Sequence, residues 1–86
     1  MGFKQGLAEA ILIEITLLAI KEVAKRTLGG AEKKKLAAEI VIKRLNEYEN
    51  IIPILSDYLN RPNINSIEKD TIEYLVQVVY DNVYKS

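Results

Sequence analysis

The chain has 86 residues with equal numbers of basic and acidic side chains, 12 of each, and it has neither cysteine nor histidine. This length suits a single domain. The balanced charge provides no global attraction for nucleic acid, and the missing thiols and imidazoles exclude a disulfide framework and argue against a conventional zinc site. We therefore expect one domain over residues 1–86, with no cofactor and no bound metal.

The first predicted element is a long helix over residues 4–28. It contains no proline, and Gly29-Gly30 follows as a C-terminal stop. Its central run, residues 7–20, reads LAEAILIEITLLAI, so apolar side chains lie nearly all round the helix. Such a helix is buried in a core, in a bundle of several chains or in lipid. The run is shorter than the ~20 residues that cross a bilayer core, so a core or an oligomer is favoured over lipid.

The apolar helix and the short chain together predict self-association. A chain of this length buries only roughly 60–68% of the surface that its unfolded form exposes, so a core shared between copies would add stability. Glu14 interrupts the apolar run. We expect its carboxylate to be partly buried and paired with a cation from another helix or another chain. The residues predicted to form the self-association seam are large and apolar: Ile11, Ile13, Leu17, Leu18 and Ile20.

Three further helices are predicted, over residues 31–49, 53–59 and 67–84. Apolar residues recur at helical spacing in the first and the last of them. Pro53 suits the first turn of the short middle helix. The predicted fold class is therefore all-α: a small helical bundle of three longer helices and one short helix, completed by self-association.

The start of the last helix is marked by the spacing from Asn65 to Glu68, which is typical of a capping box, with Ser66 as an alternative cap. Many β-branched residues make a strand a competing interpretation for residues 74–80. The cap and the acidic first turn favour a helix.

Six cations flank the Gly29-Gly30 hinge. If the hinge folds the first two helices back on each other, these cations gather at one end of the molecule. Such an end could contact anionic lipid headgroups or phosphates, or it could simply be solvated. No aromatic residue lies among them, which argues against a nucleic-acid partner. The residues predicted to contact an anion or a membrane surface are Lys21, Lys25, Arg26, Lys33, Lys34 and Lys35.

Catalytic motifs are missing from the sequence. No two carboxylates are placed to act as acid and base, and the glycines and lysines of the hinge lack the remaining residues of a phosphate-binding loop. We expect a protein that is not an enzyme. The N-terminus lacks the pattern of a signal peptide, so we expect a cytoplasmic location, with membrane association left open.

Much of the chain, from about residue 18 to residue 86, shows a recognisable order of motifs. Leu28-Gly29-Gly30-Ala31-Glu32-Lys33-Lys34-Lys35 leads into Ala37-Ala38, and Ile72-Glu73-Tyr74-Leu75-Val76 is followed by Val79-Tyr80 and Val83-Tyr84-Lys85. In this order the chain resembles the small phage holins of the LL-H type. The resemblance implies a phage-related protein that oligomerises at a membrane. Residues 7–20 are shorter than that family's membrane-spanning segment, so the resemblance points to the soluble part of a holin.

A second interpretation comes from the tyrosines of the last helix. Tyr74, Tyr80 and Tyr84 could form, with nearby acidic residues, a face that binds one protein partner. In that case the chain would be a cytosolic module of the immunity or inhibitor type.

Overall fold

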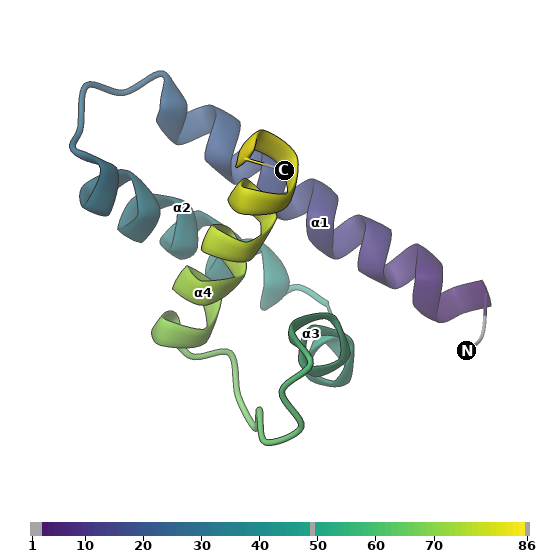
Figure 1. Ribbon diagram of the computed structural model, residues 1–86. Coiled ribbons are helices and arrows are strands. Elements are labelled where there is room, and N and C mark those ends of the chain that lie inside the picture. The colour runs from purple at the N-terminus through teal and green to yellow at the C-terminus, as the bar shows by residue number, and fades with distance from the viewer. Residues whose placement is uncertain (1–2, 49, 86) are drawn as a thin grey trace.

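The computed structural model describes residues 3–48 and 50–85 and consists of four α-helices with a final π-helical turn (Figure 1). The elements are α1 (Phe3–Ala24), α2 (Gly30–Leu45), α3 (Ile51–Leu59), α4 (Lys69–Tyr80) and η1 (Asp81–Lys85). The described residues contain no strand, so the all-α prediction is confirmed and the strand interpretation of residues 74–80 is wrong. The arrangement is a small helical bundle in which α1 is the longest element.

The two glycines of the hinge begin α2 instead of ending α1. The Arg26 amide donates to the Val23 carbonyl three residues back, 3.0 Å away, and α1 ends at Ala24, four residues before the predicted end. Gly29 is the N-cap of α2 in an extended conformation, and its carbonyl accepts the Lys33 amide at 2.9 Å. α2 ends at Leu45, and the predicted end at residue 49 lies outside the described residues.

The short helix α3 is bounded by two asparagines in the left-handed conformation, Asn50 (φ 59°) and Asn60 (φ 56°). Asparagine tolerates this conformation better than most residues. The helix begins two residues before the predicted start and places Pro53 as its third residue. Proline is accepted there because the first amides of a helix have no acceptor within it.

Helix α4 begins at Lys69, two residues after the predicted start. Glu68 is the N-cap residue, and its carbonyl accepts the Ile72 amide at 3.0 Å. The predicted capping box between Asn65 and Glu68 is wrong, because α4 begins at Lys69 and Asn65 lies too far before it to be the N-cap. The Ser66 hydroxyl instead donates to the Glu68 carboxylate at 3.2 Å. α4 ends at Tyr80, and the predicted helical path continues as η1.

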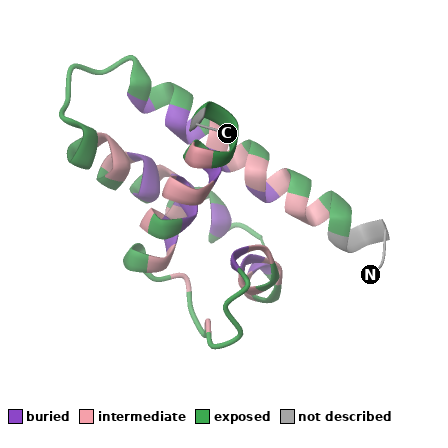
Figure 2. Ribbon diagram, viewed as in Figure 1, coloured by how far each residue is buried: buried purple, intermediate pink, exposed green. Residues whose placement is uncertain are grey.

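All four helices contribute to one hydrophobic core, which lies along one side of α1 (Figure 2). At 1.5 Å per residue α1 is about 33 Å long, and its N-terminal end projects beyond α2 and α4 (Figure 1). The largest fully buried side chains of the core are Leu12, Leu45, Leu55, Ile72, Leu75, Val41 and Val79.

The polar residue that α1 buries is Thr16, and the expectation that Glu14 is partly buried is wrong. Thr16 is fully buried, and its hydroxyl donates to the Leu12 carbonyl at 2.8 Å, so its polar group is satisfied within the helix. Glu14 is exposed. Two residues correspond to about 200° of helical rotation, which places Glu14 on the side of α1 that faces away from the core.

Leu45→Ala tests the position of this core. Leu45 is fully buried, and truncating such a leucine costs about 2–5 kcal/mol through lost burial and the cavity left behind. We expect a loss of that size in urea unfolding monitored by circular dichroism. Leu28→Ala, in the exposed α1–α2 connection, is the control and should cost about 0.5 kcal/mol or less. Equal losses for the two variants would contradict the core described here.

Candidate functional site

One side of α1 remains uncovered by the rest of the chain. Leu7 and Leu18 are 57% and 59% exposed, and Ile11, although half-buried, does not belong to the described apolar residues that pack on the core. Glu14 and Lys21 are exposed on the same side. These five residues are separated by four, three, four and three positions, which is the spacing of a coiled-coil seam. We call them the outward face of α1: Leu7, Ile11, Glu14, Leu18 and Lys21.

The predicted seam is divided between two sides of the helix. Ile11 and Leu18 lie on the outward face. Ile13 and Leu17 are half-buried and pack against the core. Ile20 is only 6% exposed and belongs to the core itself, so it is not available to a second chain. Leu7 was missed from the seam, although its spacing of four to Ile11 and eleven to Leu18 was a sequence signal for a shared face.

The six predicted cations all lie at the end of the molecule where α1 leads into α2. They occupy the last turn of α1, the connection and the first two turns of α2. Lys33 and Lys34 are half-buried and the other four are exposed. None of the six forms an ion pair with another described residue; the pair that is present, between Lys69 and Glu39 at 3.4 Å, lies elsewhere. We call this group of six cations the basic end.

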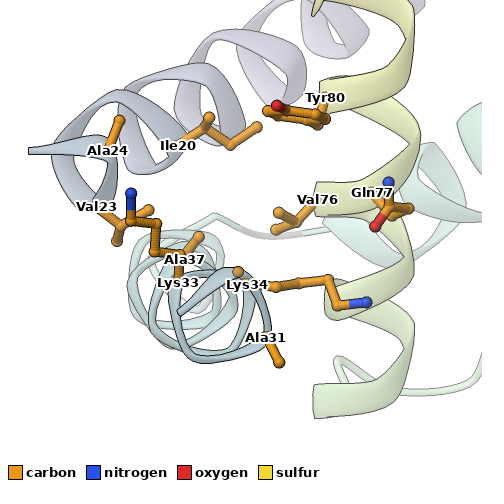
Figure 3. A pocket seen from close by; sticks show the side chains of 11 residues that line it. Ile20, Val23, Ala24, Ala31, Lys33, Lys34, Ala37, Val76, Gln77 and Tyr80 are labelled. Carbon is orange, nitrogen blue, oxygen red and sulfur yellow. The ribbon is translucent and has the colours of Figure 1, made fainter. Parts of the chain in front are cut away.

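A groove of about 600 Å³ opens beside the basic end, between α1, α2 and α4 (Figure 3). Apolar side chains dominate its walls, and the Lys34 side chain extends toward α4 (Figure 3). The volume lies within the range of small-molecule sites. The lining residues are Ile20, Val23, Ala24, Gly30, Ala31, Lys33, Lys34, Ala37, Val76, Gln77 and Tyr80.

The charged residues that line this groove, Lys33 and Lys34, are both basic. The first amides of α2 have no acceptor within the helix, and Gly29, the cap residue, offers no side chain to them. The positive end of the helix dipole therefore adds to the charges of Lys33 and Lys34. Sequence reasoning found the two lysines but not the groove, because its walls come from three helices far apart in the chain and share no periodic pattern.

The three tyrosines do not form one face. Tyr74 is 41% exposed, and the Arg61 guanidinium carbon lies 4.1 Å from the centroid of its ring. Tyr80 instead contacts Tyr84, with ring centroids 5.0 Å apart, and lines the groove. Six residues of helix place Tyr74 and Tyr80 about 120° apart. The three tyrosines therefore do not share a single side of the molecule.

Neither a metal-binding group nor a membrane-spanning helix is found in the described part of the chain. No three histidine, cysteine, aspartate or glutamate residues among residues 3–48 and 50–85 gather as a metal would require. No described helix combines the length and the apolar character needed to cross a bilayer.

Comparison with known proteins gave no match to a family model, a curated protein or a solved structure. Function is therefore inferred from the outward face of α1, the basic end and the groove.

Arg61→Ala tests the contact that holds Tyr74. A cation above an exposed aromatic ring contributes about 0.5–1 kcal/mol, so we expect a loss of that size in the free energy of unfolding measured with urea. Arg44→Ala, at an exposed position in α2 without a described ring partner, should change it by less than about 0.5 kcal/mol. A loss for Arg61→Ala no larger than for Arg44→Ala would show that the contact contributes nothing.

Proposed function

We propose that the protein is a non-enzymatic helical module that acts by self-association through the outward face of α1. The observation that carries this proposal is the exposure of Leu7 and Leu18, at coiled-coil spacing, on a helix whose opposite side forms the core. Fully burying a leucine side chain contributes about 1.5–3 kcal/mol. A second copy that covers these two leucines therefore has a substantial driving force.

The charges on the outward face favour protein over lipid as its cover. Glu14 and Lys21 lie between and beside the apolar residues, so a helix inserted flat into a membrane would take both charges below the headgroups. An interfacial helix normally keeps its charges on the opposite, wet side. A coiled-coil seam needs only a narrow apolar strip and accepts charges within and beside it.

Leu18→Glu tests the proposal, since it places a carboxylate at the centre of the outward face. We expect association of the variant to weaken at least tenfold in size-exclusion chromatography with light scattering, with no loss of helix content, because Leu18 is not in the core. Leu17 is unsuitable for this test, because it packs on the core. Tyr48→Glu adds the same charge at a position that is 45% exposed outside α1 and should leave association unchanged.

Two other results of that experiment would count against self-association through α1. The first is a wild-type protein that stays monomeric at the highest concentration tested. The second is a Leu18→Glu variant that associates as strongly as wild type.

A second candidate role, compatible with the first, is contact with an anionic membrane through the basic end. It is favoured by six cations that lack ion-pair partners among the described residues and by the exposed Leu28 between them. Each cation near an anionic surface contributes about 1 kcal/mol. The resemblance to phage holins is a separate reason, because holins assemble at membranes; a phage-related role remains part of this proposal.

Liposome flotation tests the membrane role. Lys33→Gln/Lys34→Gln removes two charges from the basic end, and Lys43→Gln/Arg44→Gln removes two exposed charges from the last turn of the same helix. With vesicles rich in phosphatidylserine we expect the first variant to float about tenfold less than wild type and the second to match wild type. Binding by wild type should fall as salt rises, because charge contacts are screened. Equal binding by both variants, or flotation with neutral vesicles, would overturn this role.

A further inference from the structure

We propose that two copies of the chain pair through the outward faces of α1 in antiparallel orientation, with Leu18 of both copies at the two-fold axis. In this arrangement Glu14 of each copy faces Lys21 of the other. The proposal rests on the proposed self-association and adds its geometry. A two-fold interface uses the same surface on both chains, and the outward face is suited to this because it carries one residue of each charge.

The signs of the charges select the orientation. Parallel helices would place Glu14 opposite Glu14 and Lys21 opposite Lys21, and like charges at such positions repel. Antiparallel helices with Leu18 at the centre instead place Glu14 of each copy near Lys21 of the other. Glu14 lies four residues before the axis and Lys21 three residues after it, at heights of about 6 Å and 4.5 Å. The difference of about 1.5 Å is small compared with the reach of a lysine side chain, so two symmetric ion pairs can form.

The apolar residues are also covered in this register. The two Leu18 side chains contact each other at the axis. Ile11 lies about 10.5 Å from the axis, level with Lys25 of the second copy, whose aliphatic stem can lie over it. Leu7, about 16.5 Å from the axis, extends beyond the last residue of the other α1, Ala24, toward the connection that exposes Leu28. Leu18 and Ile11 therefore each meet an apolar group of the second copy, and Leu7 lies at the edge of the contact.

The pairing leaves the core and the groove unchanged, and of the basic end it uses Lys21 and Lys25. The core and the groove lie on the inward sides of α1, so a helix seated on the outward face does not close the groove. The overlap of the two helices, about residues 12–24 of each, is only about 20 Å long. Such a contact is smaller than a standard stable interface, and we expect a dimer that dissociates on dilution.

Charge reversal tests the orientation, with Glu14→Lys and Lys21→Glu made separately and together. Both positions are exposed in the single chain, so neither change disturbs the core. In the antiparallel dimer each single change turns two attractive contacts into two repulsive ones, and we expect about tenfold weaker dimerisation in sedimentation equilibrium. The double variant restores unlike pairs and should dimerise within about threefold of wild type. An equimolar mixture of the two single variants should form a heterodimer.

Single cysteines provide an independent measurement, because the chain has none of its own. Leu18→Cys should form a disulfide between two copies, since the two residues meet at the axis. Leu7→Cys should not, because the two Leu7 positions are about 33 Å apart in the antiparallel pair and a disulfide needs α-carbons within about 7 Å. Parallel helices would link both variants.

The outcomes separate this geometry from the proposed function. A monomeric wild type overturns both. A dimer that Leu18→Glu disrupts, but that single charge reversals do not weaken or the double reversal does not restore, overturns the antiparallel pairing and leaves self-association standing. A Leu7→Cys disulfide as efficient as that of Leu18→Cys also overturns the pairing.

Discussion

The structure depends on the burial of α1. This helix is apolar nearly all round, and the remaining helices cover only one side of it. Ala19, Ile20 and Val23 pack into the core with α2 and α4, whereas Leu7 and Leu18 stay in water. A small domain has little surplus stability, so two exposed leucines on its longest helix are a feature that requires an explanation. Covering this face with a second copy is the explanation that also accommodates Glu14 and Lys21 on it.

The pattern of apolar residues was sufficient to predict four helices and an all-α bundle. It could not set the helix ends, because those depend on local hydrogen bonds that propensity does not reveal. Gly29 illustrates this: two glycines after a helix usually mark its end, but here Gly29 caps the next helix and α1 has already ended at Ala24. Asn50 likewise adopts the left-handed conformation that allows α3 to begin before Pro53.

The candidate surfaces were predicted less completely than the fold. A helix that is apolar all round carries no sequence signal for the side that the core will take, so the predicted seam mixed outward residues with Ile20, which is buried. The same ambiguity led to Glu14 being assigned to a partly buried position, although Thr16 is the buried polar residue. The groove was missed because it exists only where three helices meet. The basic end was found from sequence, because its cations are close along the chain.

The central claim is that the outward face of α1 is covered by a second copy in solution. Sedimentation equilibrium of the unmodified chain over a hundredfold range of concentration measures this most directly. The chain mass is 9.8 kDa, and we predict an apparent mass that rises with concentration toward twice this value and then levels off. An apparent mass that stays at 9.8 kDa over the whole range would contradict the claim.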